Sequence, residues 1–244
     1  MKQHLTDAWR TVAPPRDDPH GPLPPLLVLL TIVTGLVDAF SYLELGRVFV
    51  ANMTGNVVFL AFALGGAPGF VWWASLLGVA TFIGGAFLGG RIASARGVHR
   101  GRHLLTAASV QGAIVLVATI VAFVLPTPFG DAALVVLIVL LGVGMGLQNA
   151  TARAIAVPDL TTTVLTLTLV GISADSKPAG GAGGKVGRRF VSIASMFVGA
   201  LIGSALVTAH LAPFVLVLAT VLLAVIVARA ARFARSTDAW TTKP

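Results

Sequence analysis

The chain has 244 residues, of which 56% are hydrophobic and only 11% are charged, and its mean hydropathy is +0.92. Soluble domains usually carry about 25% charged residues, so this composition excludes an ordinary soluble protein and indicates an integral membrane protein. The absence of cysteine excludes disulfides and cysteine-ligated metal sites, and the formal charge of +8 does not indicate a nucleic-acid partner, because the basic residues fall in short loops between apolar runs.

The N-terminal 25 residues are polar and rich in proline, and they lack the apolar segment and cleavage site of a secretory signal. We therefore expect a cytoplasmic tail at 1–25, one membrane domain at 26–230 and a basic cytoplasmic tail at 231–244. Eight apolar stretches follow in chain order, at about 26–43, 50–66, 70–92, 104–125, 132–150, 160–174, 190–209 and 213–229. Crossing the hydrocarbon core takes about 20 residues, so the second and sixth stretches are marginal for a crossing.

Four basic clusters set the expected orientation. They lie in 1–25, 91–102, 175–189 and the tail after 228, and they hold 15 of the 17 lysines and arginines. Because Lys and Arg favour cytoplasmic loops, both termini should be cytoplasmic. Eight crossings would place 91–102 outside, whereas six crossings keep every cluster inside if 26–66 and 132–174 each cross once. We therefore predict an all-α protein with about six crossings, in which each of these two regions is a helix, a break and a half-helix.

The two broken regions resemble each other, which predicts an internal repeat. Residues 35–39 (GLVDA) align with 146–150 (GLQNA), and residues 82–89 (FIGGAFLG) align with 197–204 (FVGALIGS). Repeat one then covers about 26–125 and repeat two about 132–230. Three crossings per repeat is an odd number, so the second copy would lie upside down relative to the first, as in the inverted repeats of many secondary transporters.

Two long stretches carry a family resemblance. They are VDAFSYLELGRVFVANMTGNVVFLAFAL and GMGLQNATARAIAVPDLTTTVLTLTL. With these stretches the chain resembles the YoaK-like family, bacterial multi-pass membrane proteins of about this length whose function has not been assigned. The resemblance covers residues 26–230 and implies a protein of the bacterial inner membrane. It supplies no catalytic residue, so the residue roles below come from the sequence itself.

Asp38 is the first candidate site residue. It lies about 12 residues into the first apolar stretch, or ~18 Å along a helix, near the middle of a ~30 Å core. A carboxylate at that depth costs roughly 2.5–3.5 kcal/mol on insertion scales and usually faces the bundle interior or a water-filled path. One interpretation is a proton-coupling or cation-binding carboxylate. The other is a structural aspartate that pairs with Arg47 or Arg153, or that caps the broken helix.

Two amides of the second repeat extend this hypothesis. Asn149 aligns with Asp38, and Gln148 lies beside it, so a pseudo-symmetric site would place one acid opposite one amide. The alternative is hydrogen bonding between helices, a common role of Asn and Gln in membrane bundles.

The two short segments begin with residues that commonly cap helices. These are Asn52, Thr54 and Asn56 in the first repeat and Asp159, Thr161, Thr162 and Thr163 in the second. The N-terminus of a half-helix offers free N–H groups and a positive dipole end, so two such ends would bind a carboxylate or another small anion. Plain helix capping accounts for the same residue types.

Three charged residues lie next to the breaks: Glu44, Arg47 and Arg153. They would gate a cavity through ion pairs, or they would extend their charged ends to the membrane surface.

The sequence contains no HExxH or GxSxG motif, and PAGGAGGK at 178–185 lacks the Ser or Thr of a phosphate-binding loop, so we predict no enzyme, cofactor or metal site. From the broken helices and the inverted repeat we predict a small secondary transporter or permease. Its small polar or anionic solute would bind near the midplane between the two broken helices. The alternative is a non-transporting assembly or regulatory membrane protein whose polar breaks lock the fold. The expected partners are the lipid bilayer and the unknown small solute. A second copy of the chain is a further candidate, since six crossings are compatible with a homodimer.

Overall fold

The computed structural model describes residues 2–96, 99–160, 162, 165–174, 180 and 186–242. Within these ranges the chain is helical and contains no strand, which confirms the predicted all-α class. The helices are α1 (Lys2–Val12), α2 (Leu23–Glu44), α3 (Met53–Leu64), α4 (Trp72–Arg96), α5 (Arg100–Val124), α6 (Asp131–Ile155), α7 (Leu165–Ala174), α8 (Val186–Thr208), α9 (Ala212–Phe233) and the 3-10 helix η2 (Ala239–Thr241).

Six of these helices, α2, α4, α5, α6, α8 and α9, are long and apolar enough to cross a membrane. Each has 22 to 25 residues, which at 1.5 Å per residue exceeds a ~30 Å hydrocarbon core. By contrast, α3 has 12 residues and α7 has 10, or only about 18 and 15 Å. The protein is therefore a multi-pass membrane protein, with six helices of spanning length among the described residues. The two short helices α3 and α7 lie within the two marginal stretches of the sequence.

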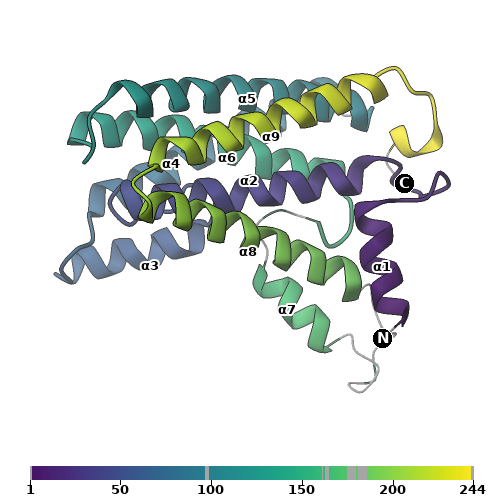
Figure 1. Ribbon diagram of the computed structural model, residues 1–244, viewed down its shortest axis with the longest axis horizontal. Helices are drawn as coiled ribbons and strands as arrows, with labels where there is room; N and C mark the ends of the chain where they lie inside the picture. Colours follow the sequence, from purple (N-terminus) through teal and green to yellow (C-terminus); the bar gives the residue numbers. More distant parts are fainter. Residues whose placement is uncertain are drawn as a thin grey trace.

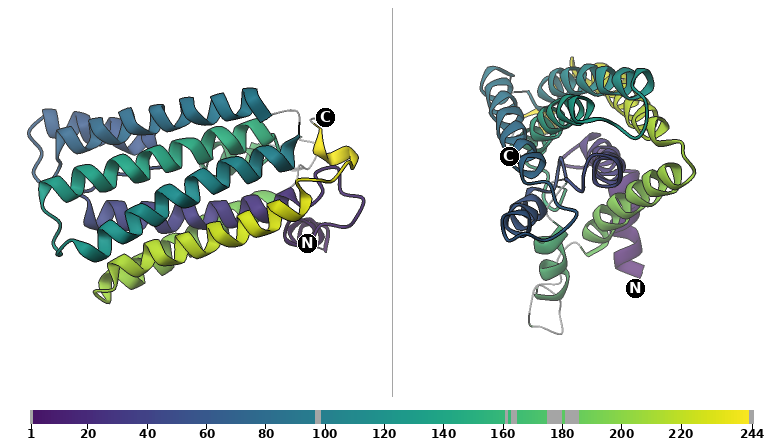
Figure 2. Two further views of the ribbon diagram at one scale, coloured as in Figure 1. Left: turned by 90° about the horizontal axis from the view of Figure 1, so that it is seen from above. Right: turned by 90° about the vertical axis from the view of Figure 1, so that its left-hand side faces the viewer.

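The six spans alternate in direction along the bundle. In Figures 1 and 2, α2, α5 and α8 run away from the end that carries both chain termini, and α4, α6 and α9 run back toward it. Helix α2 packs against α8, α4 against α6, and α5 against α6 and α9. Helices α2 and α6 are the most buried spans, and each is followed along the chain by one of the short helices.

Two close helix crossings depend on glycine. A Cβ on Gly35 of α2 would meet the backbone oxygen of Met196 and the backbone nitrogen of Ala200 on α8. A Cβ on Gly146 of α6 would meet the backbone oxygen of Phe82 and the backbone nitrogen of Ala86 on α4. Backbone atoms cannot move aside as a flexible side chain can, so any larger residue would force the two helices apart at these crossings. These are equivalent contacts at the two positions that the sequence alignment equates, and an internal repeat predicts such a pairing.

The predicted alignment of α4 with α8 is wrong by one residue. Gly85 meets the backbone of Val143 on α6, and Gly199 meets the backbone of Ile32 on α2 in the same way. Gly85 is therefore equivalent to Gly199, whereas the sequence alignment equates Gly84 with Gly199. Both helices are rich in Gly and Ala, so a shift of one residue changes little in the similarity of the two sequences.

A buried arginine of the basic cluster at 91–102 connects both terminal segments to the bundle. Arg100 is 1% exposed. Its guanidinium donates to the backbone oxygens of Ile155 at 2.9 Å and Trp240 at 3.2 Å, and to Nδ1 of His20 at 3.3 Å. The end of α6, the C-terminal tail and the chain before α2 thus meet at one side chain.

Candidate functional site

The break after α2 folds back into the bundle. Gly46 and Arg47 adopt positive φ angles of 81° and 58°, which stop the helix and reverse the chain. The segment 45–52 then returns to the level of Asp38, six residues before the end of α2, or about 9 Å along the helix axis. Helix α3 begins at that depth with Met53 and leads back outward, at the end of the bundle opposite the termini (Figure 1).

The carboxylate of Asp38 holds this returning segment in place. Its Oδ1 atom accepts hydrogen bonds from the backbone N–H groups of Val50, at 3.0 Å, and Ala51, at 2.9 Å. Its Oδ2 atom accepts one from the side-chain amide of Asn52, the residue before α3. Asp38 is 3% exposed, and all three partners are donors, which suits an ionised carboxylate that can only accept.

Of the two interpretations of Asp38, these contacts match a structural aspartate, although its partners lie just before α3 and are not the N–H groups of the helix itself. They involve neither of the arginines that the sequence offered as partners.

Asn56 provides a second anchor for the same segment. Its side-chain oxygen accepts from the backbone N–H of Phe49 at 2.9 Å, and its nitrogen donates to the backbone oxygen of Phe49 at 2.5 Å. The ring of Phe49 stacks on Tyr42 of α2 with the ring centroids 5.0 Å apart. Asn56 is fully buried, and both ends of its amide bind the chain. Its side chain therefore helps to fix the position of the segment 45–52.

A cavity of about 470 Å³ opens beside Asp38 between α2, the returning segment and α8. Asp38, Asn52 and Ser204 contribute polar groups to its wall, and Tyr42 and Phe49 contribute aromatic rings. A mostly apolar pocket with a few convergent polar groups is the usual form of a small-molecule site. Among the described residues that line this cavity, only Asp38 has a carboxylate or a basic group. Its charge would therefore determine whether a cationic or an anionic ligand is favoured.

Gln148 joins three spans in the middle of the bundle. Its amide nitrogen donates to the backbone oxygen of Leu30 at 3.1 Å and to the hydroxyl of Thr34 at 2.8 Å, both on α2. Its oxygen accepts from the amide of Gln111 on α5 at 2.7 Å. Gln111, Thr34 and Gln148 are all buried, and both ends of the Gln148 amide are bonded. These contacts match the interpretation of Gln148 as hydrogen bonding between helices.

We expect Gln148→Leu to lower the free energy of unfolding by about 1–3 kcal/mol, because it leaves the buried Gln111 amide without its acceptor. The double variant Gln111→Leu, Gln148→Leu should cost less than the sum of the two single variants, since it removes both polar partners together. Reversible unfolding in mixed detergent micelles measures all three values. Strict additivity would contradict a direct bond between the two amides.

The second break differs from the first in its polar contacts. Asp159 and Thr162 both have a φ of 63°, and Asp159 forms a salt bridge of 2.8 Å with Arg189 of α8. Thr162 is 2% exposed, and its hydroxyl has no hydrogen-bond partner among the described residues. Asn149 donates to the backbone oxygen of Met145 at 2.9 Å and makes a further interaction. Thr161 and Thr163 lie outside the described residues, so this half of the predicted site stays a prediction.

The comparisons with known proteins agree with the membrane fold. A family described as proteins of unknown function, DUF1275, matches residues 26–228. The chain belongs to the DUF1275 family. It is also 34% identical over 152 residues to the UPF0700 transmembrane protein YoaK of Bacillus subtilis (strain 168), a match that covers 62% of this chain and 65% of the relative. The expected YoaK-like family is thus confirmed. No solved structure matches the chain.

In this DUF1275 protein, the three predicted gating residues do not pair with one another. Arg47 is exposed and places its guanidinium carbon 5.6 Å from the ring centroid of Phe70, a cation–π contact. Arg153 is also exposed, and neither arginine forms a salt bridge with any described residue. Thr54, predicted as a ligand contact, has an exposed side chain and does not line the cavity beside Asp38.

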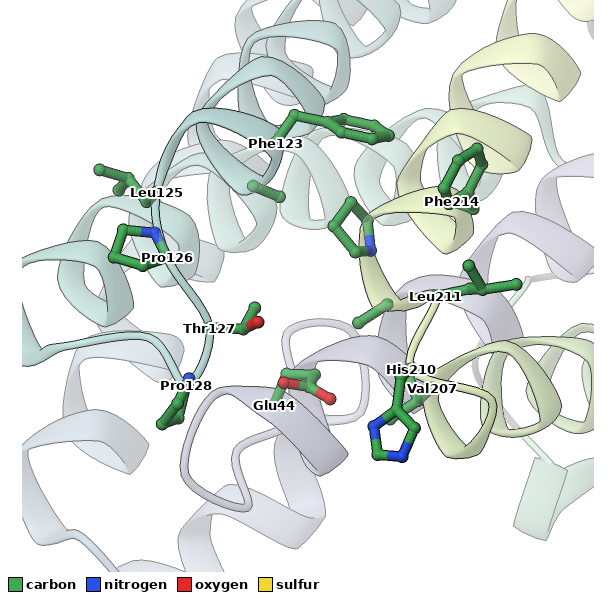
Figure 3. Close-up of a pocket in the computed structure, with 13 residues that line it drawn as sticks. Glu44, Phe123, Leu125, Pro126, Thr127, Pro128, Val207, His210, Leu211 and Phe214 are labelled. Atoms are coloured by element: carbon green, nitrogen blue, oxygen red, sulfur yellow. The ribbon is translucent and has the colours of Figure 1, made fainter.

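Glu44 lines a different cavity, of about 590 Å³, at the end of the bundle away from the termini. Figure 3 shows its carboxylate facing the space between Thr127 and the ring of His210. Glu44 follows Asp38 by six residues on α2, so at 3.6 residues per turn the two side chains leave the helix about 120° apart. The Glu44 cavity is therefore separate from the Asp38 site.

Sequence reasoning missed several residues that complete these sites. Thr34 and Gln111 carry the central hydrogen bonds, and both were detectable as polar residues inside long apolar runs. Phe49 and Val50 contribute backbone N–H groups, which donate to the side chains of Asn56 and Asp38. Because every residue except proline has an N–H group, no side-chain pattern could have singled them out.

Proposed function

We propose that the protein is a small secondary transporter or permease of the bacterial inner membrane, with both termini in the cytoplasm and a solute site in the Asp38 cavity. One observation carries this proposal. A buried carboxylate of one span lines a cavity between α2 and α8 and at the same time holds a non-helical segment inside the end of that span. Irregular backbone at that depth occurs where it lines a cavity or is buried in protein, and ionisable groups there commonly mark solute or proton paths.

The arrangement of the helices supports the proposal. The equivalent glycine crossings and the alternating helix directions (Figure 1) are what two inverted repeats of three crossings would produce. In such repeats the solute binds where the broken elements meet, and one repeat rocks against the other. The α2–α8 and α4–α6 pairs each join one helix of each repeat in direct backbone contact, so in this protein the moving bodies would be these two mixed pairs and not the two repeats themselves.

The charge of Asp38 narrows the solute class. The sequence favoured a polar or anionic solute at the start of a half-helix, where free N–H groups attract anions. In this site the carboxylate of Asp38 lies next to the start of α3 and accepts from the N–H groups of Val50 and Ala51, just before the helix, so a negative charge is already present there. A neutral polar or cationic solute is therefore the better match while Asp38 is ionised, and an anionic solute would have to displace it. Protonation of Asp38 would weaken its hydrogen bonds to the segment 45–52. Solute binding and proton binding would then be coupled through the position of this segment.

Thermal unfolding of the purified protein across a panel of small cations, polar metabolites and anions tests this proposal. A solute that binds only the folded state at 100 times its Kd adds about 2.7 kcal/mol of stability. We expect specific solutes to stabilise the native protein and the control variant Asp17→Asn, which changes an exposed residue of the N-terminal segment. The same solutes should lose most of their effect on Asp38→Asn.

The alternative function, a non-transporting assembly or regulatory protein, also has a specific observation in its favour. The hydrogen bonds of three predicted site residues, Asp38, Asn56 and Gln148, all join them to other groups of the protein. If these residues only lock the fold, the panel should produce no solute-specific shift, whereas Asp38→Asn should still unfold more readily.

A further inference from the structure

Arg188, in the first turn of α8, carries a buried charge at the end of the bundle near both termini. The residue is 6% exposed, and its Nη1 atom has no hydrogen-bond partner in the described part of the chain. It also takes no part in the salt bridge at this end, which joins its neighbour Arg189 to Asp159. A buried ionised group without a partner is costly. A bound counter-ion would remove that cost.

Arg188 lines a cavity of about 150 Å³ between α8, α1 and the chain that leads from α1 to α2. Arg10 and His20 line the same cavity, as do two carboxylates, Asp7 and Asp18. Asp18 accepts a hydrogen bond from the backbone N–H of His20 at 2.8 Å. Neither carboxylate forms a salt bridge with Arg10 or Arg188 among the described side chains. The cavity thus holds charges of both signs that do not neutralise each other directly.

The chemistry of this lining favours a phosphate group. Guanidinium groups bind phosphate through paired N–H donors, and the N-terminus of a long helix such as α8 adds a positive dipole end. The two carboxylates would repel a bare oxyanion. They would attract a positive group attached to that oxyanion, so the lining suits a ligand that carries both charges.

We propose that this cavity binds a phosphate group that bears an ammonium, the chemistry of a phosphoethanolamine headgroup. Arg188 binds the phosphate from the buried side and Arg10 from the exposed side. Asp7 and Asp18 face the ammonium. A membrane lipid and a soluble phosphate compound both supply this oxyanion, and the position at the end of a membrane span favours the lipid.

The test compares four probes by their effect on the thermal unfolding midpoint of the full-length protein in a non-ionic detergent. The probes are inorganic phosphate, soluble phosphoethanolamine, phosphatidylethanolamine and phosphatidylglycerol. We expect the two ethanolamine compounds to raise the midpoint most. In Arg188→Gln their apparent affinity should fall by about tenfold or more, since a charge-assisted bond is lost. Arg232→Gln, which changes an exposed arginine of α9 at the same end, should bind as the native protein does.

The outcomes separate the alternatives. Equal stabilisation by inorganic phosphate and phosphoethanolamine, lost in Arg188→Gln, would overturn the recognition of the ammonium and assign the site to free phosphate. No stabilisation by any probe, or equal stabilisation of the native protein and Arg188→Gln, would overturn the site itself.

If Arg188→Gln fails to fold, Asp7→Asn decides the question. The proposal predicts that it weakens phosphoethanolamine binding and leaves inorganic phosphate binding unchanged or tighter. A direct Asp7–Arg188 pair in solution predicts instead a loss of stability that no probe restores.

Discussion

Replacing Asp38 with alanine is expected to lower the free energy of unfolding by about 3–5 kcal/mol. The change leaves the buried N–H groups of Val50 and Ala51, and the partly buried amide of Asn52, without their common acceptor. Each unsatisfied buried donor costs about 1–3 kcal/mol, so the two N–H groups account for most of an effect of this size. Reversible unfolding in mixed detergent micelles measures it.

Two further variants make the Asp38 result specific. Asp38→Asn keeps one oxygen for the two backbone N–H groups, so we expect it to lose about 1–2 kcal/mol and to remain folded. Asp17→Ala removes an exposed carboxylate of the N-terminal segment and should change the stability by no more than about 0.5 kcal/mol. An Asp38→Ala effect as small as that of Asp17→Ala would show that Asp38 does not hold the segment 45–52.

The second large effect is expected at the glycine crossings. Gly35→Ala and Gly146→Ala should each lower the free energy of unfolding by about 1–3 kcal/mol, because the added methyl group would overlap the backbone of the partner helix. The control lies on α4, where a Cβ on Gly84 or Gly90 would meet no atom within 4 Å. Alanine at these positions should leave the stability unchanged or raise it by up to about 1 kcal/mol, since alanine favours the helix. The same micelle unfolding assay compares the four variants.

The two crossings also test the internal repeat. If they are equivalent, Gly35→Ala and Gly146→Ala should have effects of similar size. A large cost at one position and none at the other would contradict the equivalence that the contacts indicate.

The sequence predicted the number of spans because hydropathy and charge act over whole segments. The basic cluster at 91–102 requires an even number of crossings before it, and only the long helices α2 and α4 provide them. The sequence also singled out Asp38 and Gln148, since polar groups in apolar runs need partners, and their role as ligand contacts stays a prediction. It could not name those partners: Asp38 binds two backbone N–H groups, and Gln148 binds residues on α2 and α5.

The errors and gaps have physical causes as well. The alignment of α4 with α8 was out by one residue because glycine and alanine repeat along both helices. Thr54 was predicted to face a ligand from its place near the start of α3, yet its side chain is exposed. Position along a helix does not fix the direction of a side chain until the packing of its neighbours is known.

The most direct test of this account is the side of the membrane on which single cysteines react, because the chain itself contains none. The six-span arrangement with a cytoplasmic N-terminus predicts that Ala95→Cys, at the end of α4, reacts only from the cytoplasm. Thr127→Cys, between α5 and α6, should react only from outside, and Thr237→Cys in the C-terminal tail serves as the cytoplasmic control. Labelling of Ala95→Cys from outside with Thr127→Cys protected, while Thr237→Cys still reacts only from the cytoplasm, would mean that α3 crosses the membrane, and would contradict the returning segment on which the Asp38 site depends.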